Sequence, residues 1–187
     1  MFNFADFVIN EEVYGELNKD LPHMHIAFGV DHWFVPPMGI MMESLLNNNK
    51  HLNISFHVFL TSIEEIDKEK LSRLSQKYEN VVIKLYTVSL DLYAGIKSPI
   101  QFLLTSATLH RFIAMSYLYP EVDKVLYTDA DTCCVGLLDE LLAMPLRDYI
   151  FAAVEDGEEI MAARKAALHI DYEQSYFNLT HEKSSTS

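Results

Sequence analysis

The chain has 187 residues, and 50% of them are apolar, which is the size and composition of one globular domain. Its formal net charge of −13 argues against binding to nucleic acid or to anionic lipid through a general positive field. The acidic N-terminal segment lacks the basic and apolar regions of a secretory signal, and no apolar stretch approaches membrane-spanning length. We therefore expect a soluble protein that binds any anionic ligand through a local cationic group or a metal ion.

Strands and helices are predicted to alternate along the chain. Short apolar runs predict strands at residues 25–30, 54–60, 81–86, 124–128 and 149–154. Apolar residues that recur at helical spacing predict helices at residues 38–46, 63–78, 105–116, 138–143 and 158–168. No element is assigned to residues 1–23, which are interpreted as an N-terminal lead-in.

This alternation defines the expected fold class. Strand–helix–strand units of this spacing favour an α/β fold with a mainly parallel, Rossmann-like sheet that is flanked by helices. Such sheets bind ligands beyond the carboxyl ends of their strands. The second helix also has a start signal, because Ser62 and Glu65 have the spacing of a capping box. We expect that helix to begin at Ser62.

The cysteines and histidines give no metal or disulfide signature. Cys133 and Cys134 are adjacent, and the sequence has no CxxC zinc spacing, so a reduced, cytoplasmic setting is expected. Both cysteines are interpreted as buried small apolar residues. His23 and His25 are too isolated in the sequence to indicate a zinc site.

Two acidic residues, Asp129 and Asp131, follow directly after the predicted strand at residues 124–128. Alternate residues of a strand share a face, with Cα atoms about 6.5–7 Å apart, so the two carboxylates can converge where the strand ends. Two oxygen ligands on a rigid strand end suit Mn²⁺ or Mg²⁺, and phosphate oxygens can fill the open positions. A solvated turn, with Asp131 as the N-cap of a helix, is the alternative that stays open.

Several segments together carry a resemblance to a known family. They are HIAFGVDHWFVPPMGIMMESLLNNN at residues 25–49, SATLHR at 106–111, DKVLYTDADT at 123–132 and YFN at 176–178. In their order and spacing the chain resembles glycosyltransferase family 8, and within it the bacterial lipopolysaccharide galactosyl- and glucosyltransferases. The resemblance implies a GT-A fold, a UDP-galactose or UDP-glucose donor, Mn²⁺ (or Mg²⁺), retention of anomeric configuration and a saccharide acceptor, the lipopolysaccharide core.

The resemblance also implies a set of donor-binding residues. They are Gly29, Val30, Asp31, Phe34, Arg111, Asp129 and Asn178. Gly29, Val30 and Asp31 match a strand-end segment that cups uracil and ribose, and Phe34 matches an aromatic position beside it. Asp129 and Asp131 match the metal-binding pair. Arg111 matches a helix arginine that reaches the donor, and Asn178 matches an asparagine near the donor sugar.

Structural alternatives stay open for several of these residues. Asp31 can cap the turn before Pro36, and Arg111 can be an ordinary surface arginine. Phe34 and Trp33 can be packing residues that stack on no base. Trp33 also stands where the family generally has asparagine, which puts one donor contact in question.

The sequence departs from the family after Asn178. A polar segment from Leu179 to Ser187 follows, where the family continues with an apolar strand. The family's histidine metal ligand, its catalytic region and most of its acceptor site lie beyond that point. We therefore expect a truncated GT-A domain at residues 24–178, a disordered tail at 179–187 and no assignable catalytic residue.

Two other functions are weighed beside the transferase. One is a catalytically incompetent remnant that binds a nucleotide without turnover. The other is a haloacid-dehalogenase-type phosphatase, in which Asp129 would be the nucleophile; Cys133 stands where that pattern needs Thr or Val. For the transferase we expect a cytoplasmic location, at the inner face of the cytoplasmic membrane, and no nucleic-acid partner.

Overall fold

The computed structural model describes residues 3–17, 20–91, 106–119, 121–146 and 149–153 of the chain. The chain divides into two compact units, Met1–Ala143 and Met144–Ser187. The larger unit contains the sheet and its helices. Within the described residues, no helix is long and apolar enough to span a membrane.

One sheet with strand order β1-β4-β3-β2-β5 organises the larger unit. Its strands are β1 (Val8–Glu16), β2 (His23–Gly29), β3 (Asn53–Leu60), β4 (Val81–Val88) and β5 (Val125–Tyr127). Strands β2 to β5 are parallel to one another, whereas β1 pairs antiparallel with β4. The predicted α/β fold class with a mainly parallel sheet is confirmed.

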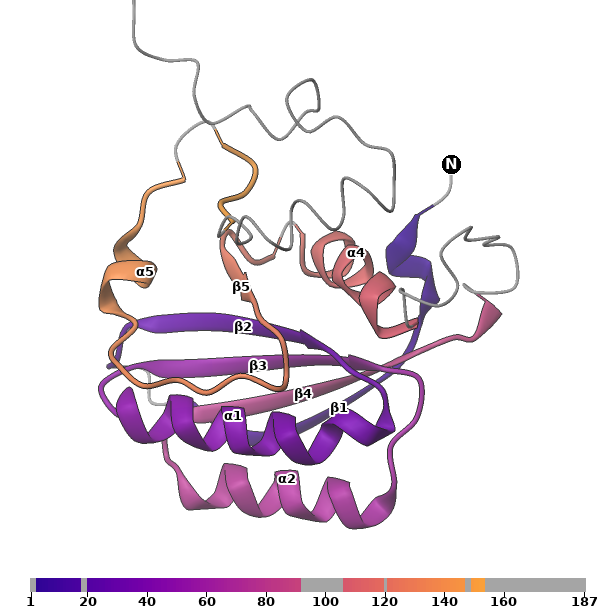
Figure 1. Ribbon diagram of the computed structural model, residues 1–187, viewed down its shortest axis with the longest axis horizontal. Coiled ribbons are helices and arrows are strands. Elements are labelled where there is room, and N and C mark those ends of the chain that lie inside the picture. Colours follow the sequence, from indigo (N-terminus) through magenta and orange to yellow (C-terminus); the bar gives the residue numbers. More distant parts are fainter. Residues whose placement is uncertain (1–2, 18–19, 92–105, 120, 147–148, 154–187) are drawn as a thin grey trace, which may run out of the picture. The chain divides into compact units, whose positions relative to one another are not determined.

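Helices cover both faces of this sheet. They are η1 (Phe4–Phe7), η2 (His32–Phe34), α1 (Val35–Asn48), α2 (Glu65–Lys77), α4 (Ser106–Leu118) and α5 (Asp139–Ala143). Helices α1 and α2 lie side by side on one face, and α4 lies on the other (Figure 1). Strand β3, in the middle of the sheet, is buried at every position because it is covered on both faces.

The core has one apolar cluster on each side of the sheet. On the α1 and α2 side, the predicted stripe of α1 is buried: Val35, Met38, Met41, Met42, Leu45 and Leu46. On the α4 side, Phe59 and Tyr86 pack with Ile113, Ala114 and Leu118. Each fully buried large side chain contributes about 1.5–3 kcal/mol, so these clusters hold the strand ends in place.

Strand β1 lies within residues 1–23, to which the sequence analysis assigned no element. Its outer position leaves it largely exposed. It pairs with β4 as an antiparallel ladder, and two ion pairs add to this: Glu12 contacts Lys68 of α2 at 2.8 Å, and Glu11 contacts Lys84 of β4 at 3.5 Å. Gly15 has φ +85°, and a Cβ there would lie 2.5 Å from the Val81 carbonyl oxygen. An edge strand with one solvated face usually shows apolar and polar residues in alternation, but in β1 Ile9 and Val13 are exposed while Glu12 is half-buried, so the sequence gives no such signal.

Other expectations need correction. Helix α2 begins at Glu65 with Glu64 as N-cap and no side-chain cap, so the capping box at Ser62 is wrong. Residues 149–153 of the predicted fifth strand form no strand, and Ile150 is exposed. An apolar run becomes a strand only where another strand pairs with it.

The expected burial of the two cysteines is also wrong. Cys133 is exposed and Cys134 is half-buried, so neither is a core residue. The predicted helix at 158–168 lies outside the described residues.

Candidate functional site

Two neighbouring parallel strands end at the same edge of the sheet, and predicted site residues follow each of them. Ala27 in β2 is level with Tyr127 in β5, and the Thr128 N–H donates to the Ala27 carbonyl at 3.2 Å. Gly29 and Asp31 therefore leave the sheet beside Asp129. The described structure brings the two predicted halves of the site to one edge.

The acidic turn is open to solvent. Asp129 and Asp131 are exposed, whereas Ala130 between them is 6% exposed and belongs to the core on the α1 side. The Thr132 hydroxyl donates to the Asp129 carbonyl at 2.8 Å and closes the turn. Among the described residues, neither carboxylate forms an ion pair or a side-chain hydrogen bond, and Asp131 caps no helix. Their oxygens are available to a ligand.

Arg111 from α4 reaches this edge from the other side of the sheet. Its guanidinium carbon lies 5.4 Å from the centre of the Tyr127 ring, a cation–π distance. Burial raises the pKa of the Tyr127 hydroxyl, the Arg111 guanidinium opposes that rise, and the Asp129 carboxylate adds to it. Arg111 is exposed, but it is held over a strand residue two positions before Asp129.

Asp31 has the capping role that the sequence left open. Its Oδ1 accepts from the Trp33 N–H at 3.0 Å and begins η2. The pKa of His110, the residue before Arg111 in α4, is lowered to about 4; burial is the largest cause, and the Phe59 backbone and the Asp31 carboxylate act in the opposite direction.

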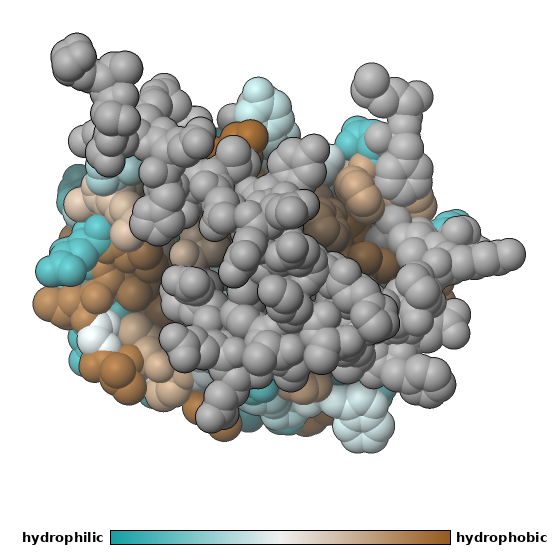
Figure 2. Space-filling model, turned by 45° about the horizontal axis from the view of Figure 1, so that its top comes forward, coloured by the Kyte–Doolittle hydropathy of each residue, from teal (hydrophilic) through white to brown (hydrophobic). Residues whose placement is uncertain are grey.

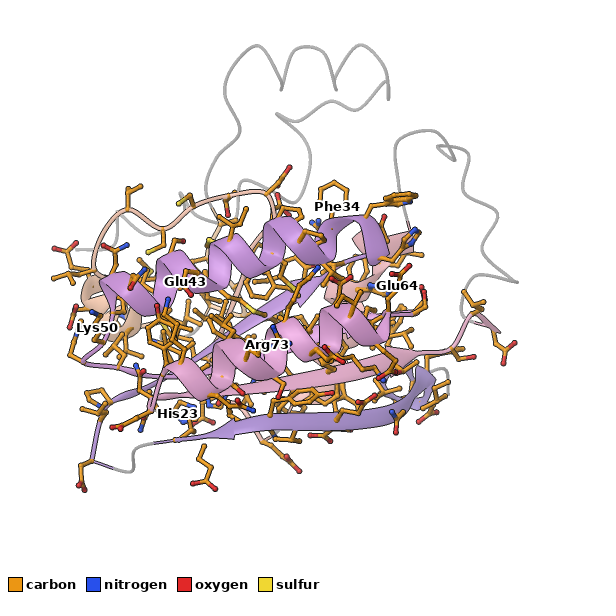
Figure 3. All side chains as sticks on the ribbon, turned by 90° about the horizontal axis from the view of Figure 1, so that it is seen from below. His23, Phe34, Glu43, Lys50, Glu64 and Arg73 are labelled. Atoms are coloured by element: carbon orange, nitrogen blue, oxygen red, sulfur yellow. The ribbon has the colours of Figure 1, made fainter. Side chains whose placement is uncertain are left out.

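Aromatic side chains follow Asp31 at the start of α1. Trp33 is 76% exposed, and the rings of His32 and Trp33 lie 4.5 Å apart. Phe34 is 42% exposed and lies at the beginning of α1 (Figure 3). Neither is a core packing residue. Figure 2 shows other apolar residues, in brown, at the surface of the face that it displays.

Gly29 and Val30 contribute backbone to this edge. The Val30 side chain is 1% exposed, and its N–H donates to the Phe59 carbonyl at 3.0 Å. A direct contact between the Val30 side chain and a ligand is therefore excluded. Asn178, the remaining predicted donor residue, lies outside the described residues.

Tyr127 and His110 are members of this site that sequence reasoning did not select. A signal for Tyr127 was present, because it stands two residues before Asp129 and alternate strand residues share a face. His110 directly precedes Arg111, but its burial depends on how α4 packs on the sheet. Among the described residues, no group of three or more His, Cys, Asp or Glu side chains could hold a metal ion.

A separate surface hollow lies between the end of β1 and α2, lined by residues that include Val13, Tyr14 and Ser75. Because β1 is antiparallel, this hollow is next to the beginning of β4, at the amino edge of the parallel strands. Ligands of parallel sheets bind at the opposite, carboxyl edge. We do not assign the hollow to the site.

A parallel sheet with helices on both faces and an acidic turn beyond its carboxyl edge defines an α/β protein of the GT-A glycosyltransferase type. The family model "Glycosyl transferase family 8" matches residues 25–186, and the chain belongs to that family. The expected family resemblance is therefore confirmed. The phosphatase alternative is set aside, since nearly the whole chain matches this family.

Curated relatives and a solved structure agree with the family. A lipopolysaccharide 1,2-glucosyltransferase of Escherichia coli is 30% identical over 155 residues, which cover 82% of this chain and 45% of that protein. A lipopolysaccharide 1,3-galactosyltransferase of Salmonella typhimurium is 30% identical over 142 residues, covering 75% and 41%. The galactosyltransferase LgtC, solved with donor and acceptor sugar analogues, superposes with a TM-score of 0.57 at 25% identity, covering 67% and 44%. The chain spans less than half the length of these relatives.

Proposed function

We propose that the chain is the donor-binding part of a hexosyltransferase that uses UDP-galactose or UDP-glucose and transfers the hexose, with retention of configuration, to a saccharide acceptor of the lipopolysaccharide core. The observation that carries the proposal is the open acidic turn at Asp129 and Asp131, which lies beside the end of β2 and begins two residues after Tyr127, whose ring Arg111 covers. The relatives are lipopolysaccharide glucosyl- and galactosyltransferases, and this supports the class of donor and acceptor.

The acidic turn has the chemistry that a divalent cation needs. Carboxylate oxygens are preferred ligands of Mn²⁺ and Mg²⁺, and those of Asp129 and Asp131 have no competing ion pair among the described residues. Two protein ligands leave coordination positions for water and for diphosphate oxygens. When bound, the cation supplies Lewis-acid stabilisation of the charge on the departing nucleotide.

The chain's own residues have distinct roles in this proposal. Arg111 presents a fixed cationic fork that suits diphosphate oxygens, and the Tyr127 ring below it keeps the guanidinium near Asp129. Gly29 and Asp31, both half-buried at the end of β2, would lie beside the nucleoside. Phe34 offers an aromatic surface beside them. In a protein with a net charge of −13, this local arrangement is what allows an anionic donor to bind.

Calorimetric titration with UDP and Mn²⁺ tests the donor site. Asp129→Asn and Asp131→Asn keep the side-chain shape and remove the charge, so metal-dependent UDP binding should be lost. Glu140→Gln, an exposed charge change on α5, is the matched control and should bind as the wild type does. Equal heats for Asp131→Asn and wild type would remove the acidic turn from the site.

Binding and turnover are separate questions for this chain. Release of UDP from UDP-galactose or UDP-glucose, measured with a lipopolysaccharide-core saccharide present, tests transfer. UDP binding without release favours the alternative of a nucleotide-binding protein that does not catalyse transfer.

A further inference from the structure

The end of α1 holds the segment that follows the acidic turn. The Ser44 hydroxyl accepts from the Cys134 N–H at 2.9 Å, and the Asn48 amide donates to the Cys134 carbonyl at 3.0 Å. Both groups of the Cys134 backbone are therefore bound to one helix. Figure 1 shows the chain after β5 running along α1 towards α5.

Asn49 extends this attachment by several residues. Its side chain is 0% exposed, and its Oδ1 accepts from the Leu138 N–H at 2.8 Å. Its Nδ2 donates to the Gly136 carbonyl at 3.4 Å and to the Leu45 carbonyl at 3.0 Å, and contacts Cys134 Sγ at 3.7 Å. A buried amide of this kind is costly unless its partners are all in place. We call Ser44, Asn48 and Asn49 the α1 clamp.

The acidic turn lies between two fixed points. On one side, β5 is paired with β2, and the Thr128 N–H donates to the Ala27 carbonyl. On the other side, the α1 clamp fixes Cys134. Only Asp129–Cys133 lie between them. Within that segment Ala130 is buried, and the Thr132 hydroxyl binds the Asp129 carbonyl.

We propose that Ser44, Asn48 and Asn49 are positioning residues that set the geometry of Asp129 and Asp131 for binding a divalent cation with a nucleoside diphosphate. They act through the Cys134–Leu138 backbone and do not touch the ligand. The inference rests on the proposed donor site. Groups that orient metal ligands from behind affect metal affinity about 10–100-fold, because a turn that is ordered beforehand loses less entropy on binding.

The test uses the whole chain and two measurements. Amide hydrogen exchange of the segment 134–138 reports on the clamp itself, and calorimetry with Mn²⁺ and UDP reports on its consequence. Ser44→Ala and Asn49→Ala should speed exchange in that segment and weaken UDP binding about tenfold or more. Ser44→Thr keeps a hydroxyl and should restore both values. Asn47→Ala is the control, because Asn47 binds Glu43 and Tyr78 and makes no contact with Cys134–Leu138 among the described hydrogen bonds.

The outcomes separate the clamp from the donor site. If Ser44→Ala and Asn49→Ala leave the hydrogen-exchange rates of segment 134–138 unchanged, the proposed role of the α1 clamp is overturned, whatever the affinity for UDP. Faster exchange with unchanged UDP affinity shows a structural contact without a role in binding, and also overturns the proposal. If wild type itself binds no UDP with Mn²⁺, the proposed donor site fails and the inference fails with it. Should Asn49→Ala not fold, Ser44→Ala and Ser44→Thr carry the comparison.

Discussion

Arg111 lies over the ring of Tyr127, with 5.4 Å between its guanidinium carbon and the ring centre. The contact joins α4 on one side of the sheet to β5, whose next residues form the acidic turn. The Arg111 guanidinium acts to lower the pKa of the Tyr127 hydroxyl, whereas the Asp129 carboxylate acts to raise it, so charges of both signs act on this one ring.

Replacing Arg111 should weaken donor binding. Arg111→Ala removes a charge-assisted contact worth about 1.5–3 kcal/mol, so the affinity for UDP in Mn²⁺ should fall tenfold or more by calorimetry. Arg111→Lys should recover part of the loss, because lysine keeps the charge but lacks the planar fork. Arg73→Ala, on α2 across the sheet (Figure 3), is the control and should bind normally. An Arg111→Ala protein with wild-type affinity would contradict this role.

Trp33 should report ligand binding directly. It is the single tryptophan of the chain, it is 76% exposed, and it follows Asp31 at the proposed site. UDP with Mn²⁺ should therefore change the intensity or position of its fluorescence emission, and the change should saturate with the calorimetric isotherm. Binding that is complete by calorimetry but leaves the emission unchanged would place the ligand away from η2.

The structure also predicts a loss of stability in mild acid. His57 lies between β2 and β4, with His25 Nδ1 at 3.0 Å from its Nε2 and the Tyr86 hydroxyl at 3.1 Å from its Nδ1. The pKa of His57 is lowered to about 3, mainly by burial and further by the charges of His25, Lys84 and His23. Burial likewise lowers the pKa of His25 to about 4.

The direction follows from proton uptake. When the pH is below the ordinary histidine pKa of 6.5, His57 in the unfolded chain binds a proton. In the folded chain His57 does not bind that proton until the pH approaches its lowered pKa of about 3. The free energy of unfolding should therefore fall as the pH is lowered from about 6.5, by up to about 1.4 kcal/mol per pH unit for each such histidine. Urea unfolding at pH 7.5 and pH 5 measures this slope.

A variant pair identifies the histidine responsible. His57→Gln should reduce the pH slope, since glutamine does not titrate, although it also lowers stability at pH 7.5. His32→Gln, an exposed position outside the sheet, should leave the slope as it is in the wild type. An equal slope for His57→Gln and wild type would exclude His57 as the source.

A substitution of Gly15 in β1, compared with one of Gly39 in α1, tests the pairing of strand β1. Gly15→Ala forces a side chain into a φ of +85° and against the Val81 carbonyl, so it should lower the free energy of unfolding by about 2 kcal/mol or more. Gly39→Ala, in α1 with nothing within 4 Å of the added Cβ, should raise it by about 0.5–1 kcal/mol. Urea denaturation of both variants checks the difference. Similar stabilities would mean that β1 does not pair with β4 as described.

The sequence was sufficient where a pattern is local. The apolar runs of β2, β3 and β4 and the stripe of α1 were predicted to within a few residues, because periodicity depends on neighbouring positions. The acidic turn was located for the same reason. The contacts of His25 with His57, and of Asn49 with Leu138, join residues far apart in the chain and depend on strand register and helix packing. No periodicity encodes these contacts, so the sequence alone does not predict them.

Ala130 has a consequence for how this protein can change. It is the middle residue of the acidic turn, yet its side chain belongs to the same apolar cluster as Met38 and Met42 of α1. The proposed ligand-binding turn is thus anchored in the interior by its own central residue. A bulkier side chain at position 130, or a cavity created beneath it in the core, should therefore shift the carboxylates of Asp129 and Asp131. Substitutions of the buried residues of α1 should therefore lower both the melting temperature and the ligand affinity. Substitutions on the exposed face of α1 can change one of these two quantities without the other.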